Sequence, residues 1–526
     1  MLGNPMLVQD FLSRAARRLP DKTALVCEDR RYSYAEIDAA SERIAAYLKE
    51  TGIRYQDRVL IFLDNSPESV IAFYGVLKAG GIFVMLSSGM KAPKLQYIIK
   101  DVDARAIITH KSKLAVVHKA LEAGATGMHL CCCGLEKDAA PPAPPGDGTR
   151  VLSSVNWDAL LDPAEPPAKV PHPGTIDVDI AMIVYTSGST GEPKGVVCPH
   201  RNMVSVTRSI VQYLENTEDD VVLSTLPLSF GYGLYQVLAS VMCGGTVVLE
   251  RSFLYPAKVI ERMVREKATG FPLVPTMAAI LLQMEQIQGL DFSSLRYLTN
   301  AAAALPEAHV KKLMTLFPNA KIYSMYGQTE CVRGTYLRPE DIVTRPSSVG
   351  GAIPNEQLFV HDADGNEVAP GEVGELVVRG SNVMRGYWNS PEETARKFRP
   401  GRYFGETLLY TGDLFRKDEE GYLYFVCRKD DLIKTKGERV SPKEIEHALC
   451  EMDGVSEAAV VGVPHEVFGQ MIKAYIVARP GAALEERQIL AFCRNRLEPF
   501  MLPGAIEFRP ELPKTPNGKI DKKQLR

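Results

Sequence analysis

The sequence predicts an α/β fold with a large N-terminal domain of two doubly wound sheets plus a small β subdomain, followed by a small α+β C-terminal domain. Helix and strand patterns alternate through the first half of the chain, which is typical of parallel, doubly wound sheets. From about residue 350 short strands separated by turns replace this alternation. A charged segment, residues 428–434, then precedes a compact tail of mixed helix and strand patterns.

Capping and turn residues locate the first elements. Ser33 and Glu36 form a capping box before a helical pattern that ends at Gly52. The alternation continues with a strand, a helix stopped by two glycines and a second strand, over residues 58–63, 67–79 and 82–86. These elements predict the first parallel sheet.

A Pro- and Gly-rich stretch, residues 139–148, reads as an exposed connector within the first part of the chain. Farther along the chain the alternation resumes, with strand patterns separated by helical ones. The strands are expected at residues 221–226, 246–249, 295–298 and 321–324. A second sheet of the same type is therefore expected.

The last part of the chain contains two different patterns of predicted secondary structure. Short strands at residues 357–361 and 374–378 predict the small β subdomain. In the tail, Pro442 begins an amphipathic helix. Its apolar face carries Ile445, Leu449 and Met452, and strands are expected at residues 455–463 and 471–477.

Composition and charge exclude several classes of function. A formal net charge of −3 over 526 residues provides no basic field for nucleic acid. The longest apolar stretch, residues 226–243, is interrupted by Pro227 and Gln236, so no membrane span is expected. No signal-peptide pattern begins the chain, which predicts a cytoplasmic protein. The ten cysteines, including the run 131–133, show neither a disulfide framework nor zinc spacing, and we expect reduced thiols.

The segment 185–195, Tyr-Thr-Ser-Gly-Ser-Thr-Gly-Glu-Pro-Lys-Gly, follows an apolar strand pattern and precedes a helical pattern that starts near Pro199. Glycines let backbone N–H groups approach an anion, and hydroxyls with a lysine suit a polyphosphate. A flexible surface loop would not need Pro193 or Lys194. A Walker loop is excluded, since Pro193 stands where that motif has glycine. The predicted phosphate-binding residues are Thr186, Ser187, Gly188, Ser189, Thr190, Gly191 and Lys194.

Five further segments accompany this one, at residues 326–330, 374–380, 410–414, 428–440 and 516–521. In this order and spacing they resemble the adenylate-forming superfamily of acyl-CoA synthetases, stand-alone adenylation enzymes and firefly luciferase. The resemblance covers nearly the whole chain, from about Gln9 to the end. One such motif is weak evidence; six in register are specific.

The resemblance implies that ATP and Mg²⁺ activate a carboxylic acid as an acyl adenylate, and that a thiol then displaces AMP. It assigns the catalytic lysine to Lys519, which bridges the substrate carboxylate and the α-phosphate. It places Thr329 at the α-phosphate and Glu330 at Mg²⁺. It also implies an adenylate-forming domain at 1–429, and a mobile domain at 430–526 that carries the catalytic lysine.

By the same resemblance, Asp413, assisted by Arg428, accepts hydrogen bonds from the ribose hydroxyls. The adenine-binding residues are Tyr326 with the run 300–304, and the nucleotide set comprises Ala302, Ala303, Tyr326, Gly327 and Gln328. The residues 300–304 could equally be helix-start packing. Asp430 matches the hinge, and its swing would bring Lys434, Lys436 and Gly437 toward the thiol channel.

The acid is expected at residues 226–233, where the substrate-binding residues are Phe230, Gly231 and Tyr232, together with Asn300 and Met325. Amino-acid-activating relatives usually carry Asp at the position of Gly231, so α-amino acids are unfavourable substrates. The neighbouring residues suggest an uncharged pocket for an aliphatic or aryl acid. Arg333 either meets a second substrate carboxylate or lies at the surface, and the surface is the favoured interpretation.

The chain ends soon after Lys519 and leaves no room for a fused carrier domain, so the acceptor is expected in trans. Coenzyme A is favoured. The alternative is the phosphopantetheine arm of a separate carrier protein, loaded by a stand-alone adenylation enzyme. A non-catalytic nucleotide-binding module is disfavoured because every motif residue is present, and nothing calls for a luciferase-like oxidation.

Overall fold

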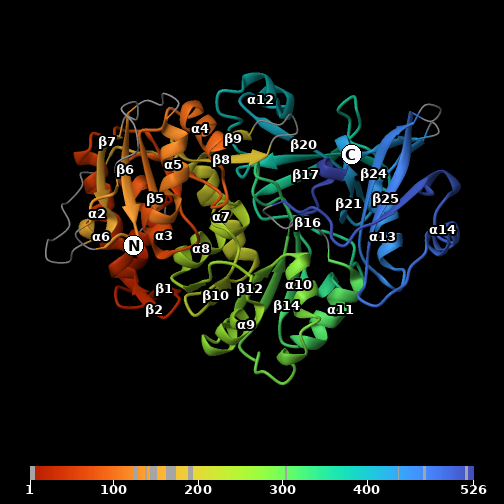
Figure 1. The fold of residues 1–526 in the computed structure, drawn as a ribbon. Helices are drawn as coiled ribbons and strands as arrows, with labels where there is room; N and C mark the ends of the chain where they lie inside the picture. The colour runs from red at the N-terminus through yellow and green to blue at the C-terminus, as the bar shows by residue number, and fades with distance from the viewer. Residues whose placement is uncertain are drawn as a thin grey trace.

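The computed structural model describes residues 6–122, 127–136, 139–142, 151–161, 173–187, 193–301, 305–435, 438–465, 469–515 and 519–525. Its strands form four sheets of seven, nine, five and five strands within this part of the chain. Figure 1 shows the two large sheets and their helices toward the N-terminal side, and the two small sheets toward the C-terminal side. The predicted α/β class is confirmed.

The seven-stranded sheet has the order β7-β6-β5-β3-β4-β8-β9. All neighbours are parallel except β8 and β9, which form an antiparallel pair. Helices α4 and α5 share a buried apolar core with one face of this sheet. The bounds are β3 Arg58–Phe62, β4 Ile82–Met85, β5 Ala106–His110, β6 Met128–Cys133, β7 Val151–Asn156, β8 Ile180–Ser187, β9 Pro193–Pro199, α4 Ala92–Asp101, α5 Leu114–Leu121 and α6 Trp157–Leu160.

The nine-stranded sheet has the order β16-β15-β14-β13-β12-β10-β11-β1-β2, and its central strands are parallel. Helices α9, α10 and α11 cover its outer face (Figure 1). The bounds are β1 Thr23–Cys27, β2 Arg30–Ser33, β10 Val221–Ser224, β11 Thr246–Leu249, β12 Gly270–Leu273, β13 Tyr297–Asn300, β14 Lys321–Tyr326, β15 Thr335–Tyr336, β16 Gly351–Ala352, α9 Pro256–Arg265, α10 Pro275–Leu281 and α11 Glu307–Leu316.

A layer of five helices lies between these two sheets and shares one buried apolar core with the inner face of each. The helices are α1 Gln9–Arg18, α2 Tyr34–Glu50, α3 Pro67–Lys78, α7 His200–Tyr213 and α8 Gly231–Cys243. The predicted capping box is present, since the Ser33 hydroxyl accepts from the Glu36 N–H and the Glu36 carboxylate accepts from the Ser33 N–H. Each large sheet thus has helices on both faces, as two doubly wound sheets require.

The predicted β subdomain is the five-stranded antiparallel sheet β17-β18-β20-β19, with β21 paired to β20. It has its own small core around Phe415. Its bounds are β17 Glu356–His361, β18 Val373–Gly380, β19 Phe398–Pro400, β20 Thr407–Lys417 and β21 Leu423–Arg428, with α12 Pro391–Lys397 beside β20.

The C-terminal segment forms the sheet β23-β22-β25-β24, with β26 paired to β25, around a separate apolar core. It packs on the β subdomain, where the Ser441 hydroxyl donates to the Val426 carbonyl at 2.8 Å. The bounds are β22 Ile433–Thr435, β23 Glu438–Val440, β24 Val455–His465, β25 Gly469–Ala478, β26 Ala505–Phe508, α13 Pro442–Cys450 and α14 Glu486–Arg494.

Several element boundaries differ from the sequence-based expectation by one or more residues, and two of these differences bear on the argument. The strand expected at residues 295–298 begins two residues later, because the Leu295 N–H closes a turn on the Phe292 carbonyl. A strand, β9, lies between the segment 188–192 and the helix α7, where the sequence indicated a helix directly. The segment therefore connects two antiparallel strands, so the expected strand-to-helix connection was wrong.

All ten cysteines lie in the described part of the chain and none forms a disulfide, as expected. Cys131, Cys132 and Cys133 are buried in β6, which confirms the strand interpretation of the triplet. Across the described residues, the structure contains no helix that is long and apolar enough to span a membrane.

Gly350 holds β16 against the strand that follows the 326–330 motif. Its φ is +79°, and a Cβ there would lie 1.9 Å from the Tyr336 carbonyl oxygen. We predict that Gly350→Ala lowers the free energy of unfolding by about 3 kcal/mol or more, from left-handed strain and backbone overlap together. Urea unfolding measures the loss.

Gly371→Ala is the matched control, because Gly371 has a φ of +90° but nothing within 4 Å of the position that a Cβ would occupy. Its loss should stay near the strain cost alone, about 1–2 kcal/mol. Equal losses for the two variants would show that the overlap at Tyr336 carries no cost.

Candidate active site

The predicted nucleotide residues converge where β14 ends beside the β subdomain. Tyr326 ends β14, and its hydroxyl donates a 2.6 Å hydrogen bond to the Asp413 carboxylate on β20. Arg428, at the end of β21, lies 3.5 Å from the other oxygen of the same carboxylate. The Gln328 amide donates to the Tyr326 hydroxyl at 3.1 Å. Residues far apart in sequence thus form one polar cluster.

Asp413 is the electrostatic centre of this cluster. Its residue is only 5% exposed, and burial raises the pKa of its carboxyl above the ordinary value. Arg428, the Tyr326 hydroxyl, Lys397 and Lys519 each act in the opposite direction. A buried carboxylate that keeps acceptor capacity suits the binding of paired hydroxyls, such as those of a ribose.

Lys519 comes from the C-terminal segment and lies close enough to Asp413 and Arg428 to interact with both charges. The surrounding protein and then the charge of Arg428 lower the pKa of its ammonium, while Asp413 raises it. The backbone of Lys519 is held by Thr515, whose N–H donates to the Lys519 carbonyl at 2.7 Å. The structure therefore brings the predicted catalytic lysine to the predicted nucleotide cluster.

Glu330 is also buried, with 7% of the residue exposed, and Lys397 lies near both it and Asp413. The Glu330 carboxylate accepts a hydrogen bond from the Tyr387 hydroxyl, and the Lys397 ammonium lies 3.7 Å away. The Lys397 ammonium also donates to the Thr411 carbonyl at 3.1 Å. Thr329 precedes Glu330 and is half-buried.

Sequence reasoning missed Tyr387 and Lys397 as members of the site. Lys397 ends α12 and Tyr387 lies shortly before that helix, in a stretch with an ordinary polar composition. Nothing in the pattern of residues 387–397 distinguishes these two side chains from exposed ones. A Lys in the last turn of a helix is also expected for the helix dipole alone.

The predicted phosphate-binding segment, residues 185–195, has its described ends in strands β8 and β9 of the seven-stranded sheet. Lys194, on β9, forms an ion pair with Glu393 of α12 and lies over the Tyr387 ring at 5.8 Å. Thr186 and Ser187 end β8. The predicted Gly188, Ser189, Thr190 and Gly191 lie outside the described residues, as do Ala302, Ala303, Lys436 and Gly437. The backbone of Lys434 lies in β22.

The predicted acid residues lie at the start of α8. Phe230 is the N-cap of that helix, and a Cβ on Gly231 would lie 3.7 Å from a Val332 methyl group. The Tyr232 hydroxyl donates to the Thr299 carbonyl of β13 at 2.8 Å. The Met325 sulfur accepts from the Tyr213 hydroxyl at 3.2 Å, while Asn300 is buried at the end of β13.

Arg333 corrects two expectations about this region. It is 2% exposed, so the surface interpretation was wrong. Its guanidinium carbon lies 5.1 Å from the centroid of the Tyr232 ring, so the surroundings of the predicted acid residues are not uncharged.

Asp430, the predicted hinge, lies in a short 3-10 helix, Lys429–Asp431, between β21 and β22. The adjacent Lys429 ammonium bonds to the buried Glu375 carboxylate at 2.8 Å. The other Glu375 oxygen accepts from the Gly412 N–H at 2.8 Å. The Glu375 carboxylate therefore connects Lys429, beside the predicted hinge, to Gly412, which precedes Asp413.

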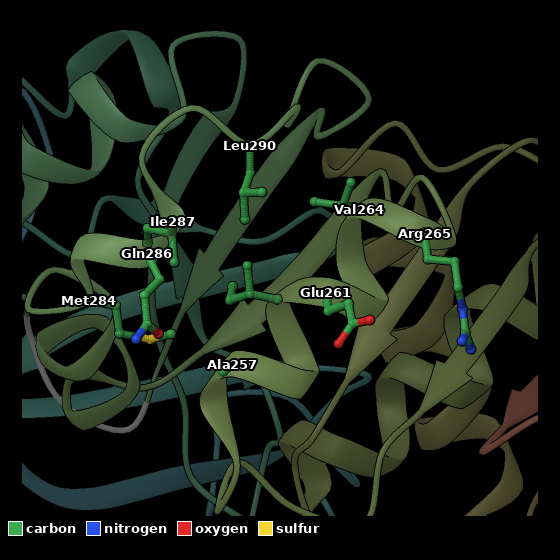
Figure 2. Close-up of a pocket in the computed structure, with 9 residues that line it drawn as sticks. Ala257, Glu261, Val264, Arg265, Met284, Gln286, Ile287 and Leu290 are labelled. Atoms are coloured by element: carbon green, nitrogen blue, oxygen red, sulfur yellow. The ribbon is translucent and has the colours of Figure 1, made fainter.

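A hollow of about 350 Å³ lies on the outer side of the nine-stranded sheet. Figure 2 shows the residues that line it. Apolar side chains of α9 and of the segment around the 3-10 helix Glu285–Ile287 line it, with Glu261 and Arg265 at its edge. None of the predicted site residues contributes to it. The hollow is thus separate from the cluster around Asp413.

Comparison with known proteins finds family models that match both the N-terminal and the C-terminal part of the chain. The model of the AMP-binding enzyme family matches residues 12–388, and the model of the AMP-binding enzyme C-terminal domain matches residues 444–519. The chain is 32% identical to a long-chain-fatty-acid–CoA ligase of Bacillus subtilis (strain 168), over 98% of this chain and 94% of that protein.

Two further similarities extend over whole chains. An indoleacetate–CoA ligase of Aromatoleum aromaticum is 30% identical, over 99% of this chain and 98% of the relative. The crystal structure of ATP-bound MatB from Rhodopseudomonas palustris superimposes with a TM-score of 0.86 at 30% identity, covering 98% of each chain.

We predict that Asp413→Asn weakens AMP binding by about tenfold or more, or about 1.4 kcal/mol, because a neutral amide is a poorer acceptor for two hydroxyls. Burial raises the pKa of the folded-state carboxyl above that of the unfolded chain. Ionisation above that pKa therefore costs folding free energy, and the amide removes this cost. The ligand-free unfolding temperature should be unchanged or raised.

Isothermal titration calorimetry with AMP and thermal unfolding without ligand give the two values. Asp364→Asn, in an exposed turn of the same subdomain, is the control and should change neither. A folded Asp413→Asn protein that binds AMP as well as the wild type would contradict the assignment.

Proposed function

This chain belongs to the AMP-binding enzyme family, and on that premise we propose that it uses ATP to activate a non-amino carboxylic acid and passes the acyl group to coenzyme A. The chain is an acid–thiol ligase that forms AMP and pyrophosphate. The observation that supports the proposal is that Lys519, from the C-terminal segment, lies within electrostatic reach of Asp413 and Arg428, where Tyr326 also donates to Asp413.

In the first half-reaction, an oxygen of the acid attacks the α-phosphorus of ATP, and the bond to the β-phosphate oxygen breaks. Negative charge gathers at the α-phosphorus, where fixed cations and donors are most useful. Lys519 supplies that cation. Thr329 contacts the α-phosphate, while the segment 186–194 holds the departing pyrophosphate.

The nucleoside is held by groups already in place. The ribose hydroxyls donate to Asp413, whose carboxylate the Tyr326 hydroxyl and Arg428 orient. Adenine lies beside Tyr326, with Gly327, Gln328, Ala302 and Ala303 around it. The pyrophosphate oxygens would compete with Glu393 for the Lys194 ammonium.

Glu330 is the residue that would hold Mg²⁺. The described residues contain no cluster of three metal-ligating side chains, but Mg²⁺ at nucleotide sites commonly binds one or two carboxylates plus phosphate oxygens. A buried carboxylate beside Lys397 and the Tyr387 hydroxyl fits that pattern. When bound, the ion neutralises phosphate charge.

In the second half-reaction, a thiol attacks the carbonyl carbon of the acyl adenylate, and AMP leaves. We assign the domain boundary to residues 429 and 430, with Asp430 as the hinge. Rotation there withdraws Lys519 and brings Lys434, Lys436 and Gly437 toward the thiol. The Lys429–Glu375 ion pair would have to adjust in this motion.

The acid and the acceptor follow from residues and relatives together. Phe230, Gly231 and Tyr232, with Asn300 and Met325, surround the acid. Gly231 provides no carboxylate for a substrate ammonium, which supports a non-amino acid. Two relatives are named as CoA ligases, which supports coenzyme A over a carrier protein. A cytoplasmic location stays a prediction.

The test of this function is a panel of carboxylic acids scored by acid-dependent pyrophosphate release, followed by mass spectrometry of the product. At least one acid should release pyrophosphate and yield an acyl-CoA. Thioester on holo carrier proteins but never on coenzyme A would favour the stand-alone adenylation enzyme. ATP binding without release for any acid would contradict the function.

Lys519→Ala should separate the two half-reactions. Adenylate formation should fall by about 10³-fold, as expected when a principal charge-stabilising group is removed. Thioester formation from a supplied acyl adenylate should be unchanged, because Lys519 has left the site by then. Lys523→Ala, on the exposed end of the chain, is the control. Equal loss of both half-reactions would sink this assignment.

A further inference from the structure

Arg333 is a buried cation without an internal counterion. Only 2% of the residue is exposed, and its Nε has no hydrogen-bond partner. No ion pair involves Arg333 among the described residues, and its guanidinium carbon lies over the Tyr232 ring, 5.1 Å from the centroid. A guanidinium stays charged in proteins, and a buried charge without a partner is strongly unfavourable.

The carboxyl group of Glu356, which shares Asn382 as a hydrogen-bond partner with the Arg333 backbone, forms no ion pair with Arg333 among the described residues. Glu356 is hydrogen-bonded at 2.7 Å to the amide of Asn382, whose nitrogen also donates to the Arg333 carbonyl at 2.9 Å. Burial raises the pKa of Glu356 well above the ordinary value, and no ion pair joins this carboxyl to Arg333 in the part of the chain that the structure describes. No described carboxylate therefore lies within ion-pair distance of the guanidinium.

The backbone on either side of Arg333, at Val332 and Gly334, forms a hydrogen-bonded turn that holds Arg333 in this position. Val332 has a φ of +60°, a conformation that a β-branched residue rarely adopts. The Val332 N–H donates to the Gln328 carbonyl, and the Gly334 N–H donates to the Tyr326 carbonyl at 2.9 Å. Strained backbone that the surrounding hydrogen bonds enforce occurs preferentially at binding sites.

The turn faces the predicted acid residues. The Val332 methyl groups lie 3.7 and 3.9 Å from the position that a Cβ on Gly231 would occupy, and apart from the adjoining chain no other described residue comes within 4 Å of it. Tyr232, whose ring Arg333 contacts, is only partly buried. A ligand that enters beside Gly231 thus reaches the neighbourhood of the guanidinium.

We propose that Arg333 recognises a second carboxylate on the acid substrate, so that the protein activates one end of a dicarboxylic acid. The inference rests on the proposed function. A guanidinium binds a carboxylate through two parallel hydrogen bonds, and the unpartnered donors of Arg333 supply them. A monocarboxylic acid leaves the buried charge uncompensated and is rejected on that account.

The test measures kcat/KM for acid-dependent pyrophosphate release on matched pairs of acids. Each pair joins a straight-chain or aryl monocarboxylic acid with the dicarboxylic acid of the same skeleton. The wild type should prefer the dicarboxylic member of its best pair by about 10²-fold or more, as sites built around a substrate polar group do.

Two substitutions at Arg333 and one elsewhere accompany the panel. Arg333→Met should lower kcat/KM for the dicarboxylic acid by about 100-fold through KM, and leave the monocarboxylic acid unchanged or improved. Arg333→Lys should keep part of the preference for the dicarboxylic acid, because lysine keeps the positive charge but cannot form the two parallel hydrogen bonds of a guanidinium. Arg338→Met removes an exposed arginine five residues along and should change neither value.

Thermal unfolding without ligand separates recognition from a structural role. Arg333→Met removes a cation that no protein group neutralises, so its unfolding temperature should equal or exceed that of the wild type. A destabilised variant with parallel losses on both acids would overturn the inference.

The panel also separates failure of the inference from failure of the proposed function. A wild type that activates monocarboxylic acids as well as, or better than, every matched dicarboxylic acid overturns the role of Arg333 and leaves the proposed function standing. A wild type that releases pyrophosphate with no acid contradicts the proposed function, and the inference with it.

Discussion

The hydrogen bond between the Tyr326 hydroxyl and the Asp413 carboxylate is the interaction on which the site depends, because it joins two different sheets of the fold. Tyr326 ends a strand of the nine-stranded sheet, and Asp413 lies on β20 of the β subdomain. The buried carboxylate then attracts cations from two directions: Arg428 from β21 and Lys519 from the C-terminal segment. Side chains from the nine-stranded sheet, the β subdomain and the C-terminal segment therefore all interact with the Asp413 carboxylate.

The electrostatic pattern around this charge prepares the site for an anionic ligand. Lys397, Lys519 and Lys194 come from three different parts of the chain, and carboxylate or carbonyl oxygens of the protein partly offset the charge of each. Polyphosphate oxygens can replace these acceptors at little net cost, because a charge-assisted hydrogen bond is exchanged for another. Arg333 differs, since its buried Nε has no acceptor among the described residues.

Local signals in the sequence were sufficient for most of the fold. The capping box at Ser33 and the glycines after α3 define elements whose bounds depend on nearby residues, and these were predicted closely. The strand β9 was not predicted, because Pro193 and Gly195 disfavour a strand and only pairing with β8 imposes one. The burial of Arg333 was likewise invisible, since packing from Tyr232 and Asn382 decides it. The site residues themselves were predicted from the order and spacing of six motifs that resemble a known family, and the hydrophobic periodicity did not indicate them.

The central claim is that the cluster of Tyr326, Asp413, Arg428 and Lys519 binds the nucleotide. A crystal structure of the protein with AMP tests it most directly. We expect adenine beside Tyr326, both ribose hydroxyls within hydrogen-bond distance of the Asp413 carboxylate, and the phosphate on the side of Thr329. AMP bound elsewhere, or an Asp413 carboxylate that makes no contact with the ribose, would contradict it.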